Sequence, residues 1–232
     1  MKKGLLFILT LMSLNVFAQM SNLIISEYGE GSGGNKKYIE LFNGTGATVN
    51  LGNYQLVKAT NGGGYTITIS LTGTLANNTT YSIANNFTDV PGANLYNGQI
   101  SHNGDDAYAL KWNGGTGSVY SIIDVFGNPT IDPGTGWAVA GVANATVDKI
   151  LTRKPNVCGP NTNWATIQGV DSLSSEYFIS VALYNQVSQN SGMGSHVHNC
   201  VASCVTYNTI TATACNSYSL NNQISRYRSI NQ

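Results

Sequence analysis

Two histidines separated by one residue, His196 and His198, have the spacing most suggestive of metal chemistry in the sequence. Alternate side chains of an extended strand point to the same face, so both imidazoles would lie on one side, where they could bind zinc or copper. No acidic residue lies within ten positions of the pair on either side to supply another ligand. We therefore favour a surface strand near a disulfide for this segment.

His102 lies beside the turn sequence Asn103-Gly-Asp-Asp106, a combination that could support acid–base catalysis. A hydrolase also needs a nucleophile and an orienting group, or a metal with an open position. No serine lies in a nucleophile-elbow sequence. A structural turn is the simpler interpretation, and we predict no catalytic residues, no cofactor and no enzymatic activity.

Carboxylates are the candidates for a hard cation such as calcium, which takes about six to eight oxygen ligands. Seven of the 11 acidic residues fall near strands and turns: Glu27, Glu30, Glu40, Asp105, Asp106, Asp124 and Asp132. The sequence has no DxDxDG loop and no calcium-binding nonapeptide repeat. We therefore predict no defined metal site, and Asp105 and Asp106 are the first residues to test for a structural calcium.

Four cysteines, Cys158, Cys200, Cys204 and Cys215, lie in the last third of the chain. Their spacing lacks the second close pair of a tetrahedral zinc site, and two disulfides are expected in an oxidising compartment. Four cysteines allow three connectivities, between which the sequence does not choose. We favour Cys158–Cys200, which would close the main domain, and Cys204–Cys215, which would close a small C-terminal unit.

The first 18 residues have the pattern of a secretory signal peptide. Lys2 and Lys3 precede an apolar run from Leu5 to Met12, and Val16-Phe-Ala18 supplies small residues at a cleavage site. The run is shorter than the about 20 apolar residues of a membrane span. We expect a secreted or cell-surface protein with no membrane span, a main domain over residues 19–200 and a short C-terminal segment over residues 201–232.

Short strands separated by turns are predicted along the main domain. Tyr65–Leu71 alternates apolar and polar residues, and Lys37–Asn43, Tyr54–Ala59 and Ala107–Trp112 are further strands. Many of the 26 glycines lie with asparagine in the turns between them. No window of a dozen residues has a helical apolar stripe. The sequence therefore predicts an all-β, antiparallel sandwich or barrel.

Ordered landmarks from residue 21 to residue 200 resemble the lamin-tail domain (LTD) family in its bacterial, secreted form. The matching segments are Ile24–Tyr28, Tyr38–Asn43, Val49–Leu56, Asn103–Leu110, Ile123–Gly127, Asp132–Trp137, Leu151–Lys154, Trp164, Glu176–Tyr177 and Gly194–His196. The resemblance implies an immunoglobulin-like β-sandwich and a non-catalytic module. In this family the domain often accompanies secreted nucleases, other hydrolases or surface proteins.

The C-terminal segment from Cys204 to Tyr218 resembles the start of a Thr-rich repeat of bacterial surface adhesins, and we expect a truncated repeat or a linker there. A net charge of zero argues against nucleic acid as the main partner. The favoured function is therefore adhesion or binding, through loops, to an extracellular or cell-surface ligand such as a glycan or a protein. The alternative is an accessory domain of an extracellular nuclease or other hydrolase. The sequence does not predict an oligomeric state.

Overall fold

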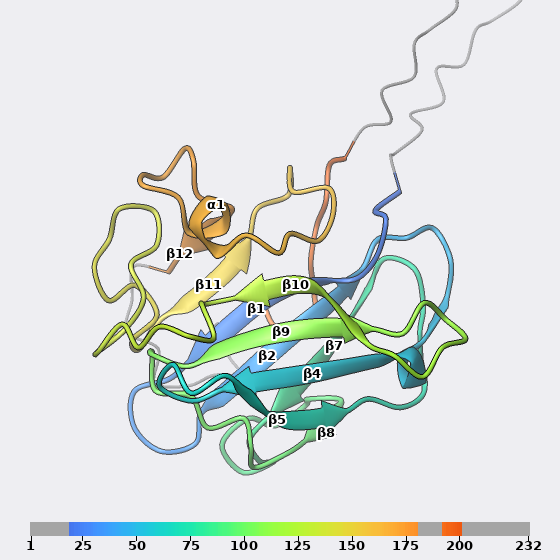
Figure 1. Cartoon of the computed structure of the whole chain (residues 1–232), viewed down its shortest axis with the longest axis horizontal. Coiled ribbons are helices and arrows are strands. Elements are labelled where there is room, and N and C mark those ends of the chain that lie inside the picture. Colours follow the sequence, from blue (N-terminus) through green and yellow to red (C-terminus); the bar gives the residue numbers. More distant parts are fainter. Residues whose placement is uncertain (1–18, 181–191, 201–232) are drawn as a thin grey trace, which may run out of the picture. The chain divides into compact units, whose positions relative to one another are not determined.

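Two β-sheets packed face to face form the domain (Figure 1). The computed structural model describes residues 19–180 and 192–200. The predicted signal peptide and the predicted Cys204–Cys215 bond lie outside these residues. The fold is the all-β, immunoglobulin-like antiparallel sandwich that the sequence predicts.

The larger sheet has six strands in the order β12–β11–β1–β2–β7–β8. Its pairs are antiparallel except for β7–β8. The strands are β1 (Ile24–Glu30), β2 (Lys37–Asn43), β7 (Thr79–Ala84), β8 (Leu95–Tyr96), β11 (Ile150–Arg153) and β12 (Tyr177–Ile179).

The smaller sheet has four antiparallel strands in the order β10–β9–β4–β5. They are β4 (Tyr54–Ala59), β5 (Tyr65–Ser70), β9 (Ala107–Trp112) and β10 (Ser121–Phe126). A two-stranded ribbon of β3 (Val49–Asn50) and β6 (Thr74–Leu75) and the short helices η1 (Leu51–Asn53) and α1 (Trp164–Gln168) complete the elements. Asn163 caps α1 by accepting a hydrogen bond from the Ala165 amide.

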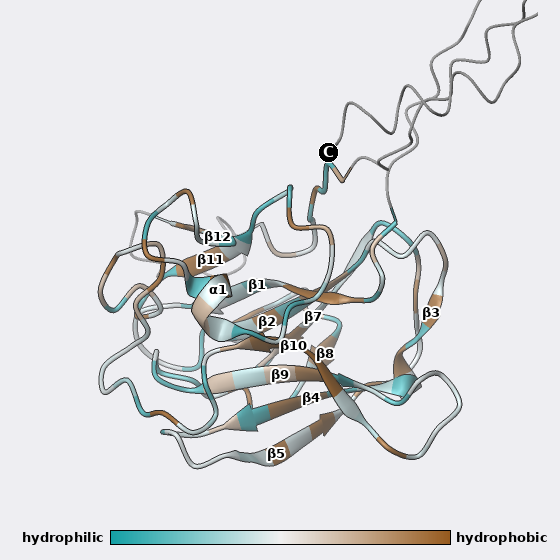
Figure 2. Ribbon diagram, turned by 45° about the horizontal axis from the view of Figure 1, so that its top comes forward, coloured by the Kyte–Doolittle hydropathy of each residue, from teal (hydrophilic) through white to brown (hydrophobic). Residues whose placement is uncertain are grey.

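The core lies between the two sheets. Alternate residues such as Ile39 and Leu41 of β2 face Leu56 of β4 and the β9 residues Tyr108 and Leu110 within one buried cluster. Figure 2 shows the corresponding apolar (brown) bands on strands such as β2, β9 and β10, whereas much of the connecting ribbon is white or teal. Burial of this apolar surface is the main stabilising contribution to such a sandwich.

The outer face of the larger sheet is also buried around β1 and β2. All seven residues of β1 and six of the seven residues of β2 are buried. Residues 192–200, which we call the strap segment, lie against this face (orange-red in Figure 1). Phe42 packs there with Met20, Ile24 and Cys200. Strands β1 and β2 are therefore covered on both faces.

Candidate functional site

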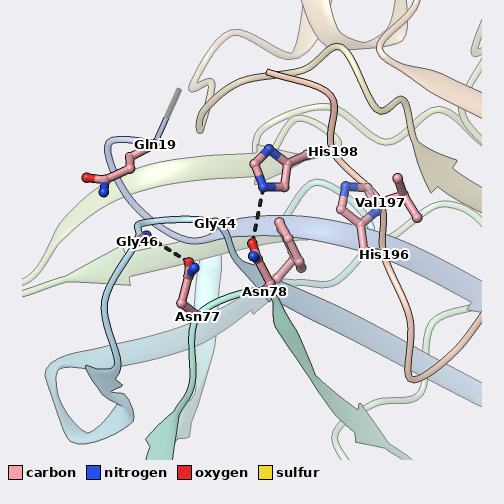
Figure 3. A pocket seen from close by; sticks show the side chains of 9 residues that line it. Gln19, Gly44, Gly46, Asn77, Asn78, His196, Val197 and His198 are labelled. Carbon is pink, nitrogen blue, oxygen red and sulfur yellow. Dashed lines mark hydrogen bonds between the residues drawn. The ribbon is translucent and has the colours of Figure 1, made fainter. Parts of the chain in front are cut away.

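The strap segment forms one wall of a surface cavity of about 480 Å3 (Figure 3). Phe42 near the end of β2, two turns and the start of the described chain also line it. The lining residues are Gln19, Phe42, Gly44, Gly46, Asn77, Asn78, His196, Val197 and His198. The cavity therefore brings together residues from four separate parts of the sequence.

The turn after β2 is fixed by the Asn43 side chain, whose Oδ1 accepts a hydrogen bond from the Thr45 amide at 3.0 Å. At Gly44 a Cβ atom would lie 2.8 Å from Sδ of Met20, so a larger residue there would require the Met20 side chain to shift. Gly46 adopts a φ of 81°, a left-handed conformation, and its amide donates to Oδ1 of Asn77 at 2.7 Å. These contacts tie the turn after β2 to the turn before β7.

His196 and His198 both pack against Phe42, with ring centroids 4.7 and 5.5 Å from the Phe42 centroid. Both imidazoles line the cavity, as does Val197 between them. The predicted strand is wrong: residues 195–199 are assigned to neither sheet. The segment crosses the face of the larger sheet instead of pairing with a strand edge.

The two imidazoles differ in their surroundings. Nε2 of His198 lies 3.2 Å from Oδ1 of Asn78, which Figure 3 shows as a dashed line. Nε2 of His196 is buried and has no hydrogen-bond partner among the described residues. Burial, aided by the nearby His198, lowers the pKa of His196 to about 4. The His196 ring is therefore neutral at physiological pH and carries a lone pair.

Two carboxylates, Glu27 of β1 and Glu40 of β2, are buried on the same outer face and lie directly opposite each other. Oε1 of Glu40 accepts from the Ser26 hydroxyl at 2.8 Å, and Oε2 accepts from the Gly194 amide at 2.6 Å. Glu27 accepts from the hydroxyls of Tyr38 and Thr152. Glu40 therefore forms the polar link between β2 and the strap segment.

Burial raises the pKa of both carboxyl groups, that of Glu40 to about 8. The hydrogen bond from Gly194 opposes this rise, whereas the charge of the neighbouring Glu27 adds to it. A proton is therefore retained between the two groups near neutral pH. From the sequence, both residues were only general candidates for a hard cation. No local pattern signals this burial, because β1 and β2 mix polar with apolar residues and the strap segment that contacts Glu40 comes from far along the sequence.

Asp105 and Asp106, the calcium candidates, lie in the loop before β9. Oδ2 of Asp106 forms an ion pair with Nζ of Lys58 at 2.8 Å, and both side chains are buried. Oδ1 of Asp105 is buried with no hydrogen-bond partner among the described residues, and burial raises the pKa of this carboxyl group. Within residues 19–180 and 192–200, no group of three or more His, Cys, Asp or Glu side chains could hold a metal ion. Calcium binding at Asp105 and Asp106 stays a prediction.

His102 is a core residue. Its Nδ1 lies 2.9 Å from the Tyr108 hydroxyl and its Nε2 lies 2.9 Å from the Gly29 carbonyl oxygen. The side chain is fully buried, and burial lowers the pKa of the imidazole well below its usual value. These contacts give His102 a structural role between the two sheets.

A disulfide joins Cys158 to Cys200 at the end of the strap segment, as the sequence analysis favoured. The link spans 42 positions of sequence. Beside it, the Asn199 amide donates to the Pro155 carbonyl oxygen at 2.9 Å. The strap segment is therefore attached covalently at one end and through Gly194 nearer its other end.

A second cavity, of about 400 Å3, lies beside α1 and the end of β10. Trp137 and Trp164 line it with amide side chains that include Asn128, Asn163 and Gln168. Neither this cavity nor the first is lined by a carboxylate, a cysteine, a serine or a lysine. The two cavities therefore lack a nucleophile with an adjacent base.

The fold and these cavities define an immunoglobulin-like β-sandwich module. Residues 18–130 match the family model of the Lamin Tail Domain, a non-catalytic family with an immunoglobulin-like fold. The match covers the first part of the resemblance noted from the sequence. No curated protein matches the chain. Among the described residues, no helix is long and apolar enough to cross a membrane.

Proposed function

We propose that the chain is a secreted or cell-surface, non-catalytic lamin-tail module that binds an extracellular ligand through its loops. The observation that carries the proposal is the Lamin Tail Domain match over residues 18–130. The Cys158–Cys200 disulfide supports export, because such bonds persist in oxidising compartments. The leader-like pattern of residues 1–18 points to the same compartment.

Exposed loop aromatics supply the contact surface for this binding. Most tyrosines on strands serve packing, and Tyr28 and Tyr108 are fully buried. By contrast, Phe87 is 67% exposed and packs edge-on against Tyr96, with ring centroids 5.8 Å apart. This pair lies in and beside the loop that joins β7 to β8. Aromatic rings presented on loops stack against sugar rings or apolar side chains, which fits a glycan or a protein ligand.

The test combines a glycan array with thermal melts of the exported chain in calcium, in chelator and with double-stranded DNA. A ligand that binds only the folded chain raises the melting temperature. We expect a glycan hit that Phe87→Ala weakens and Leu173→Ala does not. Leu173 is the matched control, because its side chain is 92% exposed and apolar but has no ring.

Other outcomes separate the alternatives. A shift with DNA and no glycan hit would contradict the adhesion proposal and favour the accessory domain of a nuclease. A calcium-dependent shift that Asp105→Asn removes would establish the calcium prediction. Hydrolysis of an array glycan by the purified chain would contradict the non-catalytic proposal.

A further inference from the structure

We infer that the side chains of Lys58 and Asp106 react with each other in the folded chain to form an amide cross-link. This inference is independent of the proposed binding function. Lys58 belongs to β4, and Asp106 immediately precedes β9, the strand that pairs with β4 (Figure 1). Nζ of Lys58 lies 2.8 Å from Oδ2 of Asp106. The cross-link would therefore join two neighbouring segments of the smaller sheet.

Burial of the pair is the strongest single observation. The Lys58 side chain is 3% exposed and the Asp106 side chain is 2% exposed. Lys58 lies opposite the core residue Tyr108 in the β4–β9 register, so the lysine points between the two sheets. Two charges held away from water carry a desolvation penalty that a neutral amide does not carry. A buried site also excludes the water that would hydrolyse the amide.

The reaction needs no further reactant. Nζ of Lys58 attacks Cγ of Asp106, and the bond between Cγ and Oδ2 breaks. Two protons of the ammonium group leave with Oδ2 as one water molecule, and the third stays on the amide nitrogen. The positive and negative charges cancel, so atoms and charge balance. Because the fold holds the two groups in contact, the step is intramolecular and avoids the entropy cost of bringing them together.

The surroundings of the pair favour this step. The Asn61 amide donates to Oδ1 of Asp106 at 3.3 Å, where it would stabilise the negative charge that develops during the attack. The Ser101 hydroxyl accepts from Nζ of Lys58 at 2.9 Å and holds the amine in place. Oδ1 of the adjacent Asp105 is buried without a hydrogen-bond partner among the described residues. Burial and the nearby charge of Asp106 raise the pKa of Asp105, which can therefore act as the general acid.

The experiment is tryptic peptide mapping of the full exported chain by mass spectrometry after reduction of the disulfides. Trypsin cleaves after a lysine with a free amine, so an unlinked chain gives separate peptides 38–58 and 59–111. In the linked chain Lys58 is blocked, and we expect one peptide, 38–111, with a mass lower by one water. Cleavage after Lys37 and Lys111 in the same digest is the internal control.

Variants test the assignment of each residue. Lys58→Met and Asp106→Ala should each abolish the loss of water. Lys111→Met is the matched control, because this β9 lysine forms no ion pair among the described residues, and it should retain the cross-link. Asp105→Asn should slow formation of the cross-link by about a hundredfold or more, measured as the linked fraction against time after cell-free synthesis.

Peptides 38–58 and 59–111 at full mass in the wild type would overturn the inference, because Lys58 would then have a free amine. A loss of water that persists in Lys58→Met would also overturn it, since a cyclic imide at Asp106 has the same mass change without the lysine. Should a variant fold poorly, the wild-type map still decides. Blocked cleavage after Lys58 together with the loss of one water identifies the cross-link.

Discussion

Glu40 is the residue whose charge state is most strongly altered by folding. Its carboxyl group retains a proton up to about pH 8 in the folded chain, against an ordinary value of 4.5. The groups around it are Glu27, the Ser26 and Thr80 hydroxyls, and the Gly194 amide. Between these two pH values the folded state holds more protons than the unfolded state. Stability due to this residue therefore falls as pH rises through this window and levels off above the folded pKa.

Glu40→Gln should remove this dependence. The amide keeps an acceptor for the Gly194 amide and has no charge to bury. The wild type should lose up to about 1.4 kcal/mol of unfolding free energy per pH unit through Glu40, and the variant should lose much less. Urea unfolding at several pH values between 4.5 and 8 measures both slopes.

Asp171→Asn is the control for this experiment. Asp171 is fully exposed, and hydrogen bonds from Ser174 lower its pKa. The stability that Asp171 contributes therefore increases as pH rises through its titration, opposite to the effect of Glu40. Replacing it should leave the slope between pH 4.5 and 8 close to that of the wild type. A Glu40→Gln slope equal to the wild-type slope would show that Glu40 ionises normally in the folded chain.

At the scale of elements, the strands were predicted more accurately than the site. Lys37–Asn43, Tyr54–Ala59 and Ala107–Trp112 agree with β2, β4 and β9 residue for residue. The alternation over Tyr65–Leu71 agrees with β5, whose apolar residues are more buried than the threonines and serine between them. These features are set by residues close together in the sequence, so the alternation of apolar and polar residues predicts them.

The cavity could be predicted only in part, because its contacts join residues far apart in the sequence. The spacing of His196 and His198 predicted rings on one side. Their partners, however, come from elsewhere: Asn78 is 120 positions from His198, and Glu40 is 154 positions from Gly194. The strap segment also contacts the sheet through the backbone amide of Gly194, which leaves no side-chain pattern to detect. The arrangement of the cavity is therefore determined by packing between segments that are far apart in the sequence.

The strap segment itself depends on the Cys158–Cys200 link. A cross-link that closes a loop of 42 positions restricts the unfolded chain and should contribute about 4 kcal/mol to stability. Replacing both cysteines with serine should lower the unfolding free energy by about this amount. It should also increase hydrogen exchange at the Gly194 and Asn199 amides, which bond Glu40 and Pro155.

Cys204→Ser with Cys215→Ser is the matched control, and peptide mapping of the wild type tests the predicted second bond. The control should leave exchange at the Gly194 and Asn199 amides unchanged. Unaltered exchange in the Cys158→Ser and Cys200→Ser protein would mean that noncovalent contacts alone hold the strap segment. In that case the disulfide would act only on the unfolded chain.

At the scale of the whole molecule, one buried ionic cluster joins the two sheets. Asp124 belongs to β10 of the smaller sheet, and Arg153 belongs to β11 of the larger sheet. Their side chains are fully buried and form an ion pair at 3.2 Å. Asp124 also accepts from the Ile25 amide at 2.7 Å, beside a bulge in β1. Glu176 forms a further ion pair with Arg153 at the edge of the cluster.

The carboxylate of Asp124 therefore satisfies the Ile25 amide, which lies outside the β1–β11 pairing, and Arg153 compensates the charge this introduces. Burial acts to lower the pKa of Arg153, but the negative charge of Asp124 and its neighbours outweighs burial and raises it. The guanidinium therefore stays charged. Removing either partner leaves the other one buried without its opposite charge. Removing both charges together should be far less harmful.

Arg153→Met should lower the unfolding free energy by about 3–5 kcal/mol, because it leaves Asp124 as an uncompensated buried charge. Asp124→Asn with Arg153→Met keeps an acceptor for the Ile25 amide and should recover part of that loss. Lys37→Met, which breaks the pair with Glu30, is the comparison and should cost less than Arg153→Met, because the Lys37 side chain is 11% exposed whereas that of Arg153 is fully buried. Chemical denaturation of the single and double variants gives the coupling energy between Asp124 and Arg153. A coupling energy near zero would mean that apolar packing alone holds the sheets together and that the ionic cluster merely occupies the space between them.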